Sequence, residues 1–300
     1  MATITLPEGI VTERCDKILA QLLQLPRAHI RYAYESFPFE CNGKPIHLHN
    51  KVSSGDVITF EPVERPKKNI TKKIFTLNVI FEDDDIMVIN KPAGITVHPA
   101  PGVREKTLVE YADEYCKQLE KIERSGIVHR LDKDTTGVMI LAKSERASRH
   151  LRTDFANHCI QKQYTCIVHG NPPLNTGKIE IPIARQNTDK AKMIACPSGK
   201  SAKTTWIVQE RFQNFSWLNV KIYTGRTHQI RVHMSYIGHP IIGDATYGKS
   251  PEASKVAPRT MLHAVSIAFL HPRTSEKLHF SAPIPQDFAD ILENLRSHKS

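Results

Sequence analysis

The feature that most limits how this chain can fold is a polar stretch that divides it into two unequal parts. Pro62 and Pro66 flank the letters VER, and KKNITKK follows them, so no apolar periodicity runs through this segment. Proline restricts the backbone and removes a hydrogen-bond donor, which suits an extended linker. We therefore predict a small domain over 1–62, a basic linker over 63–73 and a larger domain over 74–300.

The small domain has the pattern of two short helices followed by short strands. Residues 13–25 carry apolar side chains at helical spacing, Pro26 interrupts them, and residues 27–35 form a second helical segment. Residues 40–48 and 52–60 are typical of strands around Asn-Gly and Ser-Gly turns. The pattern predicts a compact α+β unit.

In the larger domain, residues 77–92 predict two apolar strands around Asp83, Asp84 and Asp85. Three adjacent carboxylates could hold a cation, but successive residues in a turn splay apart, so a plain turn is favoured. Residues 107–126 begin with a capping box and end at a glycine, which predicts one helix. A further helix is expected after an N-cap at Ser144.

Strand patterns dominate the remainder of the larger domain. They cover residues 162–170, 204–212 and 217–224, and a helical pattern returns over 228–238. Strands and helices mix without a regular βαβ alternation. The expected fold class is therefore α+β with a largely antiparallel mixed sheet.

Composition indicates the compartment and the kind of partner. The six cysteines form no C-x-x-C pair, no apolar run approaches the roughly 20 residues of a membrane span, and the N-terminus lacks a leader pattern. We expect reduced thiols, no membrane contact and a cytoplasmic monomer. The net charge of +10 lies outside residues 1–65, which hold seven basic and eight acidic residues. Such a surplus favours a polyanionic partner, although a basic surface can also serve solubility alone.

Several common sites have no signature in this chain. The sequence contains no P-loop, no G-x-G-x-x-G, no G-x-S-x-G and no H-E-x-x-H. The spacings of the 15 histidines do not form recognised ligand pairs on one helical face. No metal, nucleotide or other cofactor is therefore predicted.

Two polar segments stand out between apolar stretches. In residues 126–143, Asp132 lies in the connection that leads into a buried strand. In residues 222–234, Arg226 follows a glycine turn at the start of a helix. Taken alone, the aspartate could simply cap a turn, and the arginine could be a solvated surface residue.

The two segments together resemble a known enzyme family. HRLDKDTTG and TGRTHQIRVH, in this order and about a hundred residues apart, are similar to the two signature motifs of the RluA family of pseudouridine synthases. NKPAG, KQY, GDATYG and MLHA agree with it, so the resemblance spans 74–300. It implies the pseudouridine synthase fold and an isomerase that needs no cofactor.

The resemblance also implies roles for single residues. Asp132 matches the catalytic carboxylate, Arg226 its ion-pair partner, and Tyr164 the tyrosine that packs against the uracil. A sheet-core tyrosine remains the alternative for the last. Other matches are Arg130, the arginine that enters the RNA helix, with His129 beside it, and Leu262, the apolar floor of the site, while Lys91 and Pro92 are assigned to the scaffold.

The small domain is similar to the S-four-like RNA-binding domain that precedes many relatives. Its second helix could present Arg27, His29 and Arg31 as a basic face. The resemblance favours structured RNA as partner, specifically large-subunit ribosomal RNA, because the chain looks most like enzymes that modify it. The alternatives are a transfer-RNA pseudouridine synthase, a non-catalytic RNA-binding or ribosome-assembly protein, and a metal hydrolase that uses Asp83, Asp84 and Asp85.

Overall fold

The structure is a computed structural model that falls into two compact units, Met1–Ile70 and Thr71–Ser300. The residues that it describes are 1–25, 27–62, 76–99, 105–189, 192–248 and 257–297. The predicted linker over 63–73 lies outside these ranges. Each unit is treated below by itself.

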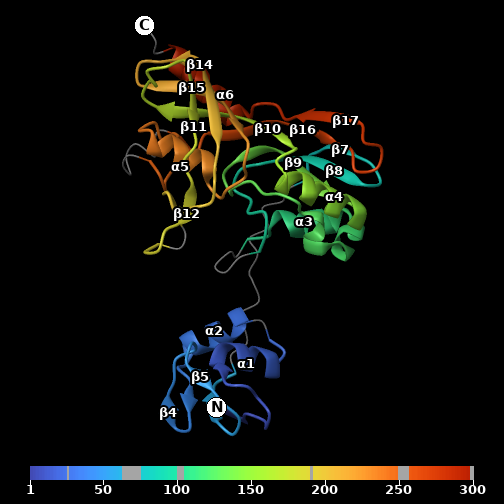
Figure 1. The fold of residues 1–300 in the computed structure, drawn as a ribbon, viewed down its shortest axis with the longest axis vertical. Helices are drawn as coiled ribbons and strands as arrows, with labels where there is room; N and C mark the ends of the chain where they lie inside the picture. Colours follow the sequence, from blue (N-terminus) through green and yellow to red (C-terminus); the bar gives the residue numbers. More distant parts are fainter. Residues whose placement is uncertain (26, 63–75, 100–104, 190–191, 249–256, 298–300) are drawn as a thin grey trace. The chain divides into compact units, whose positions relative to one another are not determined.

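The N-terminal unit combines two helices with short strands, as Figure 1 shows. A four-stranded sheet has the order β1-β6-β3-β4, and β2 pairs with β5. Leu19, Ile30, Phe39 and Ile58 are almost completely buried in its core. Its elements are β1 (Ala2–Thr5), β2 (Glu13–Arg14), α1 (Cys15–Leu22), α2 (Arg27–Ser36), β3 (Glu40–Cys41), β4 (Lys44–Pro45), β5 (Lys51–Val52) and β6 (Val57–Phe60).

The larger unit is built on a nine-stranded sheet. Its order is β11-β14-β15-β10-β16-β9-β8-β7, and β17 also pairs with β16. The strands are β7 (Val79–Glu82), β8 (Ile86–Lys91), β9 (Thr136–Ala142), β10 (Gln161–His169), β11 (Thr176–Ile179), β14 (Thr204–Arg211), β15 (Phe215–Ile222), β16 (Leu262–Leu270) and β17 (Lys277–Ser281). β9 and β16 run parallel, and the other pairs are antiparallel. The expected α+β class with a largely antiparallel sheet is confirmed.

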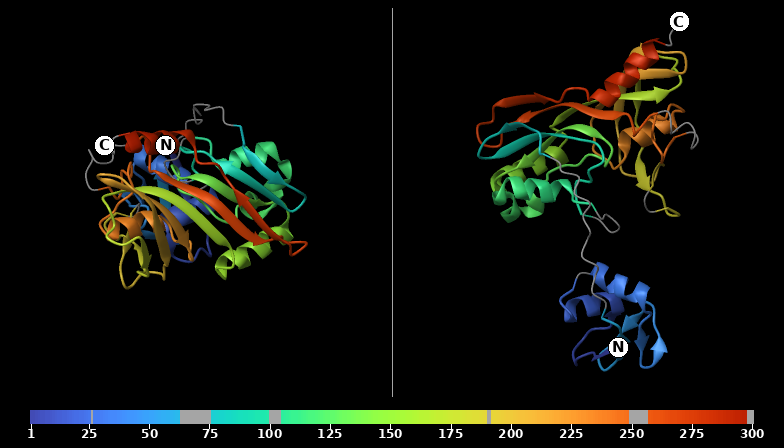
Figure 2. Two further views of the ribbon diagram at one scale, coloured as in Figure 1. Left: turned by 90° about the horizontal axis from the view of Figure 1, so that it is seen from above. Right: turned by 180° about the vertical axis from the view of Figure 1, so that it is seen from behind.

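Helices cover both ends of this sheet, as Figures 1 and 2 show. α3 (Leu108–Tyr115) and α4 (Glu145–Ala156) lie together beside β8 and β9. α5 (Gln229–Tyr236) contacts β14 and the small hairpin of β12 (Ile183–Arg185) and β13 (Met193–Ala195). α6 (Gln286–Ser297) reaches β14 and β15 through Arg296. Among the described residues, no helix is long and apolar enough to span a membrane.

Local signals in the sequence placed several elements correctly. The Ser144 hydroxyl accepts the amide of Ala147 at 3.1 Å, and Thr107 forms the predicted capping box with Glu110. The prediction of one helix over 107–126 is wrong, because α3 ends at Tyr115 and two 3₁₀ segments, η1 (Lys117–Lys121) and η2 (Glu123–Gly126), follow.

The break after α3 has a packing cause. Leu119 and Ile122, three residues apart, are both buried, and this is the repeat of a 3₁₀ turn. Positive φ angles at Arg124, Ser125 and Gly126 then turn the chain toward β9.

The Asp83 region forms the predicted turn. Asp83 Oδ1 accepts the amides of Asp85 and Ile86, each at 2.8 Å. Asp85 pairs with Arg273 and accepts the Ser144 hydroxyl at 2.8 Å. These carboxylates are used to hold the turn and anchor neighbouring segments. Within the described ranges, no group of three or more side chains could hold a metal ion.

Candidate active site

Asp132 lies on the connection that leads into β9. Leu131 beside it is buried, and the amide of Thr135 donates to the carbonyl of Asp132 at 3.2 Å, which closes a turn. At Gly137 the φ angle is 115°, and a Cβ would lie 2.2 Å from the carbonyl oxygen of Ala264. Only glycine fits such a contact, so Gly137 lets β9 lie directly against β16.

Lys91 supports the Asp132 turn through hydrogen bonds to its backbone. It ends β8, is fully buried, and its Nζ donates to the carbonyls of Pro92, Lys133 and Thr135 at 2.8, 3.0 and 2.9 Å. Burial lowers the pKa of Lys91 to about 7, and the charges of Asp134 and Asp132 oppose that shift. The ammonium group therefore joins β8 to both sides of the Asp132 turn, which is a scaffold role.

We predict that Lys91→Met destabilises the protein. Methionine fills a similar volume but donates no hydrogen bond, so the carbonyls of Pro92 and Thr135 lose this donor. Removing a desolvated cation offsets part of that loss, and we expect a net decrease of about 2 kcal/mol in the free energy of unfolding. Urea denaturation measures it, with the exposed Lys277→Met as the matched control. Equal midpoints for both variants would contradict the scaffold role.

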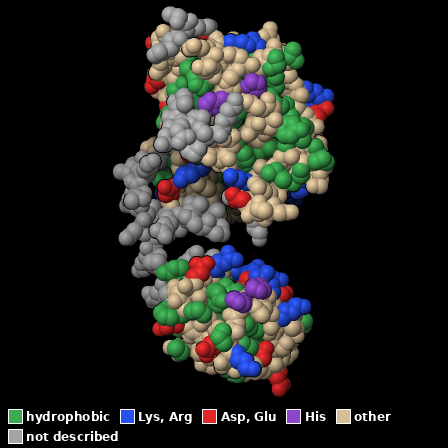
Figure 3. Space-filling model, turned by 90° about the vertical axis from the view of Figure 1, so that its left-hand side faces the viewer, with side chains coloured by type: hydrophobic (Ala, Val, Ile, Leu, Met, Phe, Trp, Pro, Cys, Tyr) green, Lys and Arg blue, Asp and Glu red, His purple; other side chains and the backbone are tan. Residues whose placement is uncertain are grey.

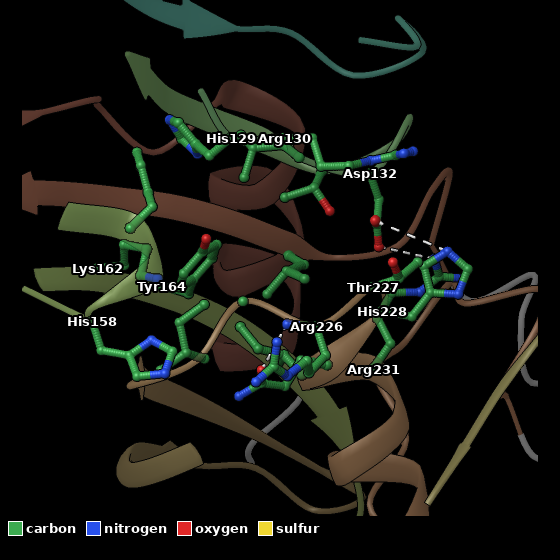
Figure 4. A pocket seen from close by; sticks show the side chains of 18 of the residues that line it. His129, Arg130, Asp132, His158, Lys162, Tyr164, Arg226, Thr227, His228 and Arg231 are labelled. Atoms are coloured by element: carbon green, nitrogen blue, oxygen red, sulfur yellow. Dashed lines mark hydrogen bonds and ion pairs between the residues drawn. The ribbon is translucent and has the colours of Figure 1, made fainter. Parts of the chain in front are cut away.

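The ion-pair partner of Asp132 is Arg231, and the prediction of Arg226 is wrong. Arg231 Nη1 lies 3.1 Å from Asp132 Oδ2, as the dashed lines in Figure 4 mark. Arg226 precedes α5, and its Nε donates instead to the carbonyl of Ser201 at 2.8 Å. Arg231 belongs to the first turn of α5, which directs it toward the Asp132 turn.

Asp244 fixes the orientation of Arg231. Its carboxylate, whose side chain is 0% exposed, accepts Nε and Nη2 at 2.6 and 2.9 Å. Burial would raise the pKa of Asp244, but the hydrogen bonds and charge of Arg231 hold it below its usual value. Likewise, burial would lower the pKa of Arg231, and the two aspartates raise it. The guanidinium is thus a permanent cation with two of its donors taken by Asp244.

His228 approaches the other carboxylate oxygen of Asp132. Its Nε2 lies 3.9 Å from Oδ1, and its Nδ1 lies 2.8 Å from the hydroxyl of Tyr247. The ring of Tyr247 also packs on the Arg231 guanidinium, 5.1 Å from the ring centroid. Burial lowers the pKa of His228 despite the nearby charge of Asp132. His228, Tyr247 and Arg231 therefore form one wall around the carboxylate.

Asp132 lines a cavity of about 450 Å³. Tyr164 on β10 and Leu262 at the start of β16 are both buried and line it, and Figure 4 shows the Tyr164 side chain in its middle. Burial and the charge of Asp132 raise the pKa of Tyr164, so its hydroxyl stays protonated. A second recess of about 510 Å³ adjoins this cavity, and Asp132 and Arg231 line both.

His129 and Arg130 line the same cavity but differ in their surroundings. His129 Nε2 accepts the amide of Ile140 at 3.0 Å, and its ring stacks on Phe155. Burial, with the charge of Lys162, lowers the pKa of His129 to about 3, so it is a neutral side chain that ties the loop to β9. Arg130 is exposed and lines both recesses, where its guanidinium can reach a ligand.

In the N-terminal unit, Arg27 and Arg31 both lie on α2. Arg27 pairs with the buried Asp16, which also accepts Arg14, while Arg31 is exposed. Figure 3 shows Lys, Arg and His side chains gathered on one face of this unit. Part of the positive charge expected there is therefore neutralised by Asp16.

The cavity suits a planar, neutral ring beside an oriented carboxylate. Tyr164 and Leu262 supply apolar surface, and Asp132 is held by a bidentately anchored arginine. Sequence reasoning missed Arg231, Asp244 and Lys162. All three lie in segments that already carried the resemblance, but the pairing of Arg231 with Asp244 and the burial of Lys162 could be identified only from the folded chain.

Comparisons with known proteins give concordant similarities. Residues 85–236 match the family described as RNA pseudouridylate synthase. The chain is 38% identical over 299 residues to "uncharacterized RNA pseudouridine synthase YlyB" of Bacillus subtilis (strain 168), with 98% of each chain covered. It is 36% identical over 314 residues to "ribosomal large subunit pseudouridine synthase D" of Pasteurella multocida (strain Pm70), with 99% and 97% covered. The solved structure "human RNA pseudouridylate synthase domain containing 4" is similar with a TM-score of 0.59 at 25% identity, covering 73% of this chain and 93% of that one.

Proposed function

The chain belongs to the RNA pseudouridylate synthase family, and from that premise we propose that it converts specific uridines of large-subunit ribosomal RNA to pseudouridine. The family makes it an isomerase that acts on RNA. The carrying observation is Asp132 in a cavity, held by Arg231, which Asp244 anchors. Support for the ribosomal substrate comes from the name of the Pasteurella relative, which matches nearly the whole length of this chain.

The reaction needs what this cavity offers. The bond from the sugar C1′ to the ring N1 breaks, the base turns, and C1′ joins C5, whose proton is lost while N1 gains one. A uridine within folded RNA must first leave its stack, at a cost of a few kcal/mol. Asp132 supplies the carboxylate beside the reacting centre, and Arg231 fixes its direction by a charged hydrogen bond.

Other residues receive roles that fit their positions. The protonated, buried Tyr164 offers a ring face to the uracil, and Leu262 forms the apolar floor. Arg130, exposed at the mouth, takes the place that the extruded base leaves in the RNA helix. Arg31 and Arg27 on α2 add phosphate contacts from the N-terminal unit.

The substrate is tested in cells that contain the gene, lack it, or carry it restored on a plasmid. Pseudouridines in ribosomal and transfer RNA are mapped by chemical derivatisation. We expect one or more sites in large-subunit ribosomal RNA to disappear on deletion and to return on complementation. If pseudouridines disappear only from transfer RNA, the substrate is transfer RNA and not ribosomal RNA. Identical maps in the three strains would reject the proposed function.

A further inference from the structure

The Lys162 side chain is largely buried, its ammonium group reaches the cavity, and the described part of the fold supplies no acceptor for it. It lies on β10 with 7% of its surface exposed, and it lines the cavity. Across the described residues, no hydrogen bond or ion pair engages its Nζ, which lies over the Phe155 ring, 5.5 Å from its centroid. Lys91, which is also buried, donates to three carbonyls. A buried cation is costly unless it is paired, so the position of Lys162 indicates a ligand.

The surroundings of Lys162 are positive. A Cβ at Gly225 would lie 3.9 Å from Nζ, so the ammonium faces the turn that precedes α5. Arg226 follows in that turn, and its Nε donates to a neutral acceptor, the carbonyl of Ser201. The charge of Arg226 lowers the pKa of Lys162 further than burial alone. Among the described residues that line the cavity there are four lysines and arginines but one carboxylate, Asp132.

That carboxylate does not neutralise Lys162. Figure 4 shows Lys162 and Asp132 on opposite sides of Tyr164. Asp132 faces Arg231 and His228, which contact its two oxygens. The cavity therefore has one wall where a negative charge is already paired and another wall where two positive charges remain available.

We propose that Lys162 and Arg226 bind a backbone phosphate next to the extruded uridine. The inference rests on the proposed function, and it deepens it by naming a second contact within the same cavity. RNA carries one phosphate per nucleotide, so a base that enters the cavity brings an anion with it. A uracil carbonyl is neutral and could not offset two cations, whereas a phosphate accepts charged hydrogen bonds from both.

Neutralising that phosphate tests the contact directly. The substrate is a stem-loop around the mapped uridine, with a methylphosphonate on its 5′ or its 3′ side. Both this RNA and its phosphodiester control carry a 2′-O-methyl group on the sugar preceding the linkage, which prevents strand cleavage. Dissociation constants are measured with full-length protein in an Asp132→Asn background so that no RNA is converted, and Lys162→Met is compared with the exposed Lys277→Met.

We expect the methylphosphonate at one of the two positions to weaken binding about 10- to 100-fold when Lys162 is present. Lys162→Met should also weaken binding of the phosphodiester RNA, and its response to the methylphosphonate should be smaller than that of its parent, because only Arg226 then contacts the phosphate. Lys277→Met should respond like its parent. Lys162→Met removes an unpaired and largely desolvated charge, so its melting temperature should not fall, which separates lost binding from misfolding.

The pH dependence gives a second readout. The pKa of Lys162 is lowered to about 8, so the free ammonium loses its proton as pH rises through that value. Affinity should therefore fall between about pH 7 and about pH 9.5, and Lys162→Arg should abolish the fall because arginine stays charged. Among the groups that face Lys162, His129 is neutral and Tyr164 keeps its proton over this range. Burial lowers the pKa of His228, so it loses its proton at lower pH. Arg226 and His158 also line the cavity.

The outcomes separate this inference from the function on which it rests. One outcome is that the wild-type enzyme forms pseudouridine while the methylphosphonate, on either side of the uridine, weakens binding by the same factor in Lys162→Met as in its parent. In that case the phosphate contact is rejected and the enzyme assignment stands. If the wild-type enzyme converts no RNA, both fail. A methylphosphonate effect that is smaller in Lys162→Met than in its parent, and unchanged in Lys277→Met, supports the contact.

Discussion

Asp132→Asn should reduce pseudouridine formation by at least about 10⁴-fold while leaving RNA binding intact. Asparagine keeps the size and shape of the side chain, but it provides no carboxylate to the reacting nucleotide. The other charged side chains that line the cavity are one lysine and three arginines, so removing its one negative charge does not weaken phosphate contacts. The result expected is therefore an inactive protein that still binds its RNA.

The measurement is single-turnover release of tritium from C5-labelled RNA, together with a dissociation constant for the same RNA. Asp84→Asn is the matched control, since Asp84 is 89% exposed in the turn after β7 and its loss changes the net charge equally. Activity of the Asp132→Asn enzyme within tenfold of wild type would remove Asp132 from the chemistry.

Arg231→Met should produce the second large effect, on stability as well as activity. It leaves Asp244 buried without a cation, and breaking such a pair costs about 3–5 kcal/mol. It also frees Asp132 from its charged donor, so pseudouridine formation should fall by about 10²-fold or more. Arg226→Met, which breaks no ion pair with Asp132, should preserve stability and act through RNA affinity.

The pH dependence of unfolding distinguishes the loss of this pair from general damage. In the wild type, the pKa of Asp244 is lowered, so its contribution to stability is present above the unfolded value of about 4 and is lost as pH falls through the folded value. In Arg231→Met, burial without a cation raises the pKa of Asp244. The loss of stability relative to wild type should therefore become smaller as the pH is lowered toward about 4.

A double variant provides the control for Arg231→Met. Arg231→Met with Asp244→Asn removes both charges, so it should regain part of the stability without regaining activity. A double variant no more stable than Arg231→Met, or a defect in the single variant that does not change with pH, would show that Asp244 is not the cause.

Local signals in the sequence were sufficient for elements whose causes are local. The hydroxyl of Ser144 and the capping box at Thr107 act within one turn, so their helices begin where the sequence indicates. The 3₁₀ segments after Tyr115 depend on the burial of Leu119 and Ile122, which no local pattern reveals. For the same reason the largely antiparallel sheet was predictable as a class, and its strand order was not.

The site shows the same division between local and long-range causes. The resemblance identified Asp132, but the motif offers two arginines, Arg226 and Arg231, and the choice between them depends on Asp244 in a later loop. Lys162 was not predicted as a site residue, because the sequence alone does not show whether a lysine side chain is buried. Both answers require distances between segments that are remote in the chain.

Lys91 supports the backbone of the Asp132 turn, and Arg231 holds the Asp132 carboxylate. These contacts determine whether the protein or the RNA must deform during catalysis. An acid clamped in this way has little freedom to travel toward a nucleotide, so the strand must bend to deliver its uridine. Recognition would then favour RNA segments that are already loosely stacked or easily kinked, and mechanical compliance of the substrate becomes part of its specificity.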